Sequence, residues 1–241
     1  MADGLYMAQV FYTRYTTEFE NCAGYDDIRA QFRNVHEKMF DPKTGLYCHG
    51  YDASRKAFWA GEDGKSKNPW LRSLGWFAAA LVDVIGYIAP GHDDFKNEMI
   101  AIARELAENL IPYVDPKTGM LYQVPNQVGR EGNYPETSGS AMVAYFFLKG
   151  ARLGILEYSC CPRGEAIFQS ICDRYLTERD GKLNLGGICL VAGLGPENNR
   201  RRDGSYEYYI SEPVVENDAK GVAPFLMCYT EHLLSHELDE E

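Results

Sequence analysis

The stretch DPKTG occurs twice in this sequence, at residues 41–45 and again at residues 115–119. Its proline and glycine enforce a turn, and each copy follows an amphipathic segment, 25–40 in the first round and 94–113 in the second. A degraded copy of the turn, residues 178–183, closes a third round. The chain is therefore an internal repeat in which the identical turns start 74 residues apart, and this period indicates stacked pairs of helices.

Each repeat pairs a strongly apolar segment with an amphipathic one. The predicted apolar helices are 1–12, 74–88, 141–153 and 222–234, and the predicted amphipathic helices are 25–40, 94–113 and 163–177. In an α/α toroid the apolar helices line the inside and the amphipathic helices cover the outside, so this pattern favours a toroid over a solenoid. We expect the first helix to be buried on most sides, and we expect a short strand at 46–51 that pairs with 57–60.

Composition and charge narrow the range of functions. The net charge of −11 argues against a nucleic-acid partner, because phosphate contacts need basic surface. No apolar run approaches the length of a membrane span and no secretory signal is recognisable, so no membrane partner is expected. The seven cysteines form no CxxC pair and have no histidines at ligand spacing, which predicts a cytoplasmic protein without a metal site. No linker divides residues 1–241, which are expected to form a single domain.

The inner helices of a toroid begin on one rim, and the loops before them carry polar residues suited to chemistry. Asp3, Trp70, Arg72 and Trp76 fall at such beginnings, and the hairpin residue His49 should reach the same rim. The same loops also contain Glu136, Ser138, Asn217, Asp218 and Lys220. Positive helix ends favour an anionic ligand, aromatic faces suit sugar rings, and an arginine can fork onto a carboxylate. The sequence contains no serine-triad, phosphate-loop or metal-ligand pattern that competes with this site.

Each of these residues also has a simpler interpretation. Asp3 and Asp218 can each cap the helix that follows. Arg72 can be a surface ion-pair residue, and the tryptophans can be packing residues. His49 can have a structural role in its strand. The convergence of an acid, an arginine, a histidine and aromatic rings on one rim favours the functional interpretation.

Six segments, in order along the whole chain, carry a family resemblance. They are ADGLYMAQVFYTRY (2–15), DPKTGLYCHGYD (41–52), NPWLRSLGWFAAAL (68–81), ETSGSAMVAYFFLKGARLGIL (136–156), VAGLG (191–195) and RDGSYEYYISEPVVENDAKGVAPFLM (202–227). On these segments the sequence resembles the unsaturated rhamnogalacturonyl hydrolases of glycoside hydrolase family 105, relatives of the unsaturated glucuronyl hydrolases of family 88. The resemblance implies an all-α (α/α)6 toroid with short β-hairpins at the active-site rim.

The resemblance also implies a reaction and the residues that perform it. These enzymes act on small pectin-derived oligosaccharides whose non-reducing end is a 4,5-unsaturated galacturonic acid. They hydrate its vinyl ether double bond and release the neighbouring rhamnose, without a metal or organic cofactor. The catalytic aspartate, which protonates C4 and activates water, matches Asp3. The residues that match contacts to the substrate are His49, Trp70, Arg72, Trp76 and Tyr206.

The family has further helices before its D-G-L-[YF]-M segment. This chain is therefore expected to be the C-terminal part of the toroid, an incomplete barrel with about seven of the twelve helices. The flanks of its first and last inner helices should then be exposed, which predicts self-association through the open edge or a partner that supplies the missing helices. Two other functions stay open: an inactive or carbohydrate-binding fragment of such an enzyme, and another α/α-toroid sugar enzyme such as an epimerase.

Overall fold

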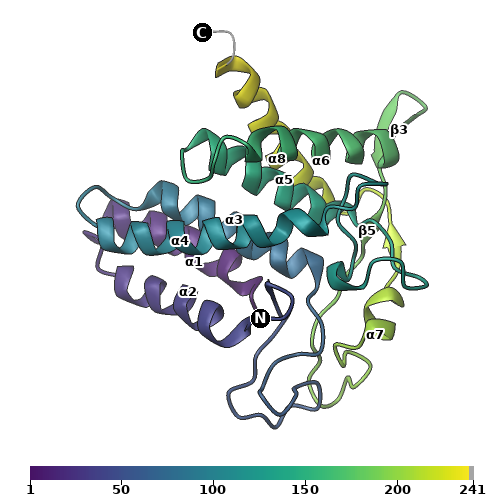
Figure 1. The fold of residues 1–241 in the computed structure, drawn as a ribbon, viewed down its shortest axis with the longest axis horizontal. Helices are drawn as coiled ribbons and strands as arrows, with labels where there is room; N and C mark the ends of the chain where they lie inside the picture. The colour runs from purple at the N-terminus through teal and green to yellow at the C-terminus, as the bar shows by residue number, and fades with distance from the viewer. Residues whose placement is uncertain (239–241) are drawn as a thin grey trace.

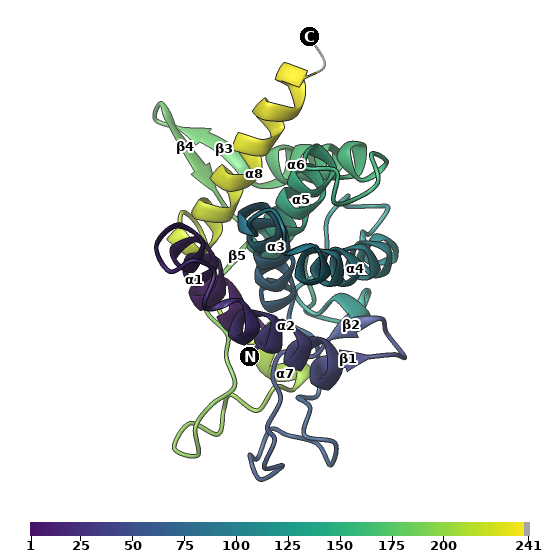
Figure 2. The same cartoon turned by 90° about the vertical axis from the view of Figure 1, so that its left-hand side faces the viewer.

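Two curved layers of helices make up the fold, which a computed structural model describes for residues 1–238 (Figure 1). The inner layer consists of α1 (Gly4–Phe19), α3 (Leu71–Tyr87), α5 (Thr137–Arg152) and α8 (Ala219–Leu238). The outer layer consists of α2 (Tyr25–Met39), α4 (Asp93–Leu110) and α6 (Cys160–Tyr175). Consecutive inner helices pack side by side, and the outer helices cover them. Figure 2 shows α4 and α6 outside α3 and α5, with α1 and α8 at the two ends of the arc. The seven long helices of the described residues confirm the predicted toroid architecture.

The burial of the two layers follows the hydrophobic pattern of the sequence. α3 packs against α1, α4 and α5, and nearly all of its residues are buried. α2 buries one stripe, including Ile28, Phe32 and Met39, while Arg29 binds Glu98 of α4 at 2.5 Å. Each large apolar side chain buried in this way contributes about 1.5–3 kcal/mol of transfer free energy. Within residues 1–238, none of the helices combines the length and apolarity needed to cross a bilayer.

The first inner helix, α1, is buried on one side only, so the expectation of a helix buried on most sides is wrong. Its outer side carries one large apolar residue per turn, with Phe11 72% and Phe19 71% exposed. We call this row, Met7, Phe11, Tyr15 and Phe19, the α1 ridge. It is exposed because no other helix of residues 1–238 packs against that side of α1. Leu226 of α8 is likewise 54% exposed, as expected for the two ends of an incomplete arc.

Three inner helices begin three or four residues earlier than predicted. Their observed first residues are Leu71, Thr137 and Ala219, where the predicted starts were 74, 141 and 222. Polar residues at these starts interrupt the apolar run that marked each predicted helix. In α5, the Glu136 carboxylate accepts hydrogen bonds from the N–H groups of Ser138 (3.1 Å) and Gly139 (2.7 Å) and so caps the helix. Arg72, Ser138 and Lys220 therefore lie in the first turns of helices, whereas Asp3 and Glu136 directly precede theirs.

The two DPKTG copies form the same turn. Gly45 and Gly119 have φ values of 70° and 67°, a left-handed conformation that favours glycine. In each copy the glycine N–H donates to the carbonyl oxygen of the first residue, Asp41 or Asp115, at 2.8 Å. The repeat recognised in the sequence is therefore also a repeat of backbone conformation.

Short antiparallel strand pairs lie next to the turns and at the rim. They are β1 (Phe40–Asp41) with β2 (Leu46–Tyr47), β3 (Leu176–Arg179) with β4 (Lys182–Leu185), and β5 (Ile188–Cys189) with β6 (Val214–Val215). The predicted pairing of 46–51 with 57–60 is wrong, because the DPKTG turn folds β2 back onto the residues just before it. The remaining short elements are η1 (Ile111–Tyr113), η2 (Pro125–Gln127) and the helix α7 (Tyr206–Ile210), which the sequence did not predict.

Side chains fill the inside of the arc below the rim. The Tyr6 ring of α1 lies 4.2 Å, between centroids, from the Trp76 ring of α3. The Tyr6 hydroxyl donates to Met227 Sδ of α8 at 3.6 Å. Further along the inner helices, Lys149 of α5 binds Asp83 of α3, with Nζ and Oδ1 2.7 Å apart. We call these five residues the arc floor.

Candidate active site

Asp3 lies directly before α1 and is tied to α3 by hydrogen bonds. Its N–H donates to Ser73 Oγ, and this hydroxyl donates in turn to Asp3 Oδ1, each at 3.3 Å. The N–H of the preceding residue, Ala2, donates to the carbonyl oxygen of His49 at 3.3 Å. In the described part of the chain the Asp3 carboxylate accepts no hydrogen bond from the N–H groups of α1, so the helix-cap interpretation is wrong. Its side chain remains 23% exposed, which leaves it open to a ligand.

His49 faces Asp3 from the hairpin segment that follows β2. Its Nδ1 lies 2.7 Å from the Tyr209 hydroxyl, and its Nε2 lies 3.9 Å from Asp3 Oδ1. Nε2 is buried, and nothing among residues 1–238 forms a hydrogen bond with it. Burial lowers the pKa of His49 to about 3, so the ring is neutral at neutral pH. Burial raises the pKa of the Asp3 carboxyl, although the positive amino terminus, the hydrogen bonds from the backbone and Ser73 and, least of all, the charge of Arg72 act in the opposite direction.

Trp70 and Tyr209 form an aromatic wall behind His49. The centroid of the Trp70 ring lies 4.8 Å from that of His49 and 6.3 Å from that of Tyr209, to which it is nearly parallel. The Trp70 indole Nε1 donates to Gln123 Oε1 at 3.2 Å. Trp70 is only 3% exposed, so most of its surface is packed against protein, as the packing interpretation expects. A ligand at Asp3 would meet only the small part of the ring left open.

Arg72 lies in the first turn of α3 and is buried, so its interpretation as a surface ion-pair residue is wrong. Its Nε donates to Ser138 Oγ at 2.7 Å. Its Nη2 donates to the carbonyl oxygen of Cys189 and lies 3.7 Å from Glu136 Oε1. The guanidinium carbon lies 5.3 Å from the centroid of the Trp70 ring. Arg72 therefore brings a positive charge to the aromatic wall, with two of its three nitrogens already bound by protein.

The remaining predicted site residues lie to either side of this cluster. Trp76 is part of the arc floor, farther along α3 than Arg72. The Tyr206 hydroxyl donates to the carbonyl oxygens of Arg130 (3.1 Å) and Glu131 (2.9 Å), which ties α7 to the loop after η2. Asp218 Oδ1 accepts from the N–H of Lys220 at 2.9 Å, which supports its interpretation as a cap of α8.

Tyr209 is the site residue that the sequence did not single out. The segment GSYEYY offered three tyrosines, and Tyr206 and Tyr209 are three residues apart, which places them on the same side of a helix. The sequence pattern therefore could not tell which of the two contacts His49. Their hydrogen bonds separate them, because only the Tyr209 hydroxyl bonds to the histidine.

Two long loops, residues 48–70 and 190–205, extend from the rim on the side of the N-terminus, as Figure 2 shows. They are joined to each other by Lys67 Nζ and Asp203 Oδ2, 3.2 Å apart. A second link is the hydrogen bond from Asn68 Nδ2 to the carbonyl oxygen of Gly204, at 2.9 Å. Because His49 and Trp70 lie at the ends of the first loop, these contacts help to fix the site.

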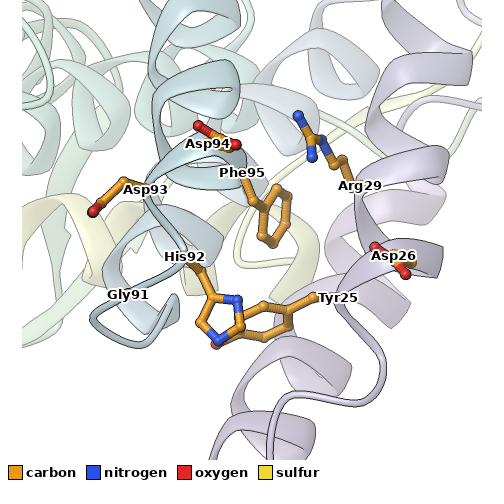
Figure 3. Close-up of a pocket in the computed structure, with 8 residues that line it drawn as sticks. All are labelled: Tyr25, Asp26, Arg29, Gly91, His92, Asp93, Asp94 and Phe95. Carbon is orange, nitrogen blue, oxygen red and sulfur yellow. The ribbon is translucent and has the colours of Figure 1, made fainter.

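Hollows elsewhere on the molecule do not coincide with this cluster. One of about 350 Å³ lies between the beginnings of α2 and α4, with Tyr25, Arg29 and His92 in its wall (Figure 3). It contains none of the predicted site residues, and its arginine already binds Glu98. We place the site at the rim on its chemistry, since an acid, a neutral histidine and a buried arginine meet there. Residues 1–238 contain no group of three His, Cys, Asp or Glu side chains arranged to hold a metal ion.

The curved double layer of helices defines an α/α-toroid protein. An acid, a histidine and aromatic rings lie together at the rim of its inner layer, so the candidate active site is at the beginnings of the inner helices. Residues 2–235 match the family model described as Glycosyl Hydrolase Family 88. The chain belongs to this family, which confirms the resemblance recognised in the sequence.

Individual relatives agree with this assignment. Protein Atu3128 of Agrobacterium fabrum is 42% identical over 196 residues, which are 79% of this chain and 83% of that protein. A solved structure of a family 105 glycoside hydrolase from C. acetobutylicum ATCC 824 is 40% identical with a TM-score of 0.92, over 97% of this chain. The unsaturated glucuronyl hydrolase of Bacillus sp. GL1, at 12% identity and a TM-score of 0.67 over 95% of this chain, shares the fold. The chain spans 64% of the length of the clostridial structure and 57% of that of the Bacillus enzyme.

Proposed function

We propose that this protein hydrolyses glycosides of unsaturated uronic acids, and that its substrate is a small pectin-derived oligosaccharide ending in 4,5-unsaturated galacturonic acid linked to rhamnose. The observation that carries the proposal is the approach of Asp3 to His49 at the rim of a family 88 fold. The choice of substrate follows from the resemblance to family 105, to which the C. acetobutylicum structure of 40% identity belongs. The cytoplasmic location expected from the cysteines remains a prediction.

Asp3 acts first as an acid and then as a base in this proposal. The protonated carboxyl gives its proton to C4 of the vinyl ether, which leaves positive charge shared by C5 and the ring oxygen. The resulting carboxylate takes a proton from the water that adds to C5, and the hemiketal so formed opens and releases the neighbouring sugar. An acid with this role needs a raised pKa, and burial shifts the pKa of Asp3 in that direction.

His49 and Arg72 hold the reacting sugar. The neutral imidazole has a buried Nε2 with no partner among the described residues, 3.9 Å from Asp3, and can form a hydrogen bond with a hydroxyl of the uronate. Arg72 supplies the positive charge for the uronate carboxylate. Trp70 and Trp76 lie beside the sugar. Tyr206 stabilises the rim by its hydrogen bond to the loop after η2.

The test is loss of the ultraviolet absorbance of the unsaturated uronate when the protein is incubated with the unsaturated galacturonyl-rhamnose disaccharide. We expect turnover in the wild type and a loss of at least about 100-fold in Asp3→Asn, the usual scale for removal of a general acid. The matched control is Asp27→Asn, which changes an exposed aspartate at the beginning of an outer helix. Equal turnover in wild type and Asp3→Asn would refute the role of Asp3. Binding of the disaccharide without turnover would instead indicate a carbohydrate-binding fragment, and activity on saturated sugars alone would indicate another toroid enzyme.

A further inference from the structure

Arg72 has one nitrogen that the protein leaves free. Nε is bound to Ser138 Oγ at 2.7 Å, and Nη2 is bound to the carbonyl oxygen of Cys189. Among the described residues nothing accepts a hydrogen bond from Nη1, and this atom is not one of the fully buried unpaired atoms. A fork onto a carboxylate through Nε and Nη2 would therefore compete with these protein acceptors. Nη1 is therefore the nitrogen on which the described residues leave both N–H groups open to a ligand.

A chain of hydrogen bonds fixes the occupied side. The Ser138 hydroxyl accepts from Arg72 Nε and donates to Glu136 Oε1 at 2.6 Å, so it links the two charged groups. Glu136 is fully buried, and its oxygens also accept from the N–H groups of Ser138 (3.1 Å), Cys189 (3.0 Å) and Gly139 (2.7 Å). The carboxylate cannot rotate without breaking several of these bonds, so it is a rigid support for the serine and the arginine.

We infer that Glu136 and Ser138 are positioning residues that orient Arg72 so that it presents Nη1 to the substrate carboxylate. The inference deepens the proposed function and rests on it where it assigns the carboxylate to Arg72. Because Nη1 faces the ligand, its direction decides the strength of binding, and the Ser138 hydroxyl helps to set that direction by holding Nε. Glu136 and Ser138 therefore control the affinity for the charged end of the substrate more than they control the rate of the chemical step.

Ser138→Ala tests this role with little disturbance of the fold, because the backbone N–H groups that Glu136 caps remain in place. The matched control is Ser140→Ala. Ser140 is also fully buried in α5, but its hydroxyl bonds to the backbone of Leu121 and does not touch Arg72. For the unsaturated disaccharide we expect Ser138→Ala to raise KM about tenfold, equivalent to about 1.4 kcal/mol, and to change kcat by less than about threefold. For the methyl ester of the same disaccharide, KM should be equal in wild type and Ser138→Ala.

A second measurement tests the orientation of Arg72 without any substrate. In ¹⁵N NMR spectra the Nε–H signal of Arg72, identified by its loss in Arg72→Lys, should exchange slowly with water in the wild type and in Ser140→Ala. In Ser138→Ala the exchange should be faster by about tenfold or more, because the acceptor has been removed. Unchanged exchange in Ser138→Ala, or an equal KM effect in both serine variants, would overturn the inference. A wild type that neither binds nor converts the disaccharide would refute the proposed function, while the exchange measurement would still decide whether Ser138 orients Arg72.

Discussion

Replacing Tyr209 by Phe removes a single oxygen atom from the contact that orients His49. The hydroxyl lies 2.7 Å from His49 Nδ1, and both side chains are fully buried. Burial raises the pKa of Tyr209 well above its usual value, so the phenol keeps its proton. If the phenol donates to Nδ1, the imidazole carries its own proton on Nε2, directed at the Asp3 carboxylate. In the other tautomer Nδ1 carries the proton and donates it to the phenol oxygen. The lone pair of Nε2 would then point at the Asp3 carboxylate, and the phenol proton would have no acceptor.

The first consequence of Tyr209→Phe is a loss of stability. Nδ1 is left buried without a partner, and an unsatisfied polar group of this kind costs about 1–3 kcal/mol. We therefore expect the free energy of unfolding, measured in urea, to fall by about 2 kcal/mol. The second consequence is a change of tautomer, because the donor that holds the proton on Nε2 is lost. The ¹⁵N shifts of labelled histidine should show His49 as the Nε2–H tautomer in the wild type and as a mixture in the variant.

Tyr208→Phe is the matched control for the tautomer. Tyr208 neighbours Tyr209 and is also buried, but its hydroxyl accepts from the N–H of Gly193 at 2.9 Å instead of contacting His49. This variant should lose stability yet retain the Nε2–H tautomer. A wild-type His49 protonated on Nδ1 would refute the reasoning. So would a Tyr209→Phe variant with the tautomer and the unfolding free energy of the wild type.

Three further predictions concern pH, the arc floor and the α1 ridge. The pKa of His49 is about 3 in the folded protein and about 6.5 in the unfolded chain, so between these pH values only the unfolded chain binds the extra proton. Lowering the pH from 7 to 5 should therefore reduce the free energy of unfolding, measured in urea, by about 2 kcal/mol. This loss should be absent from His49→Gln. Lys149→Met removes the counter-charge of the buried Asp83 carboxylate, which keeps only the hydrogen bond from Tyr145, and should lower the free energy of unfolding by about 3 kcal/mol. Arg14→Met breaks an exposed pair and should cost less than about 1 kcal/mol, so equal losses would contradict the assignment of the first pair to the interior. Self-association through the α1 ridge predicts a dimer or larger species in light scattering that Phe11→Lys converts to monomer, and a monomeric wild type would exclude it.

The repeat made the layers of this fold predictable from the sequence. Two identical DPKTG turns and the difference in polarity between the helices of each pair were enough to assign the inner and outer layers. The hydrophobic pattern alone wrongly predicted a buried α1, because the hydrophobicity of a helix does not report whether a neighbour is present to cover it. The ridge of Phe11 and Phe19 is apolar in sequence and exposed in the structure for this reason. The expectation of an exposed flank came instead from the family resemblance.

The candidate site was predictable in position but not in its hydrogen bonds. The rim argument brought Asp3, His49 and Arg72 together, and in the structure His49 lies beside Asp3 while the Trp70 ring connects His49 to Arg72. The contact of Arg72 with a carboxylate ligand stays a prediction, and the hydrogen bonds of its Nε and Nη2 to Ser138 and Cys189 were not predictable from the sequence. Whether a ligand or a protein group binds the N–H groups of Arg72 depends on distances between separate helices. The spacing of residues within one motif does not determine these distances.

The arc floor has a consequence for the direction from which a sugar chain can approach. Tyr6 and Met227 meet from opposite ends of the inner layer just below Asp3, and Lys149 and Asp83 occupy the space farther in. Under the proposed function, an oligosaccharide that enters by the rim would meet these side chains below Asp3. Only its terminal residue would then be presented to Asp3, so processing would proceed one chain end at a time, with release and rebinding between successive cuts.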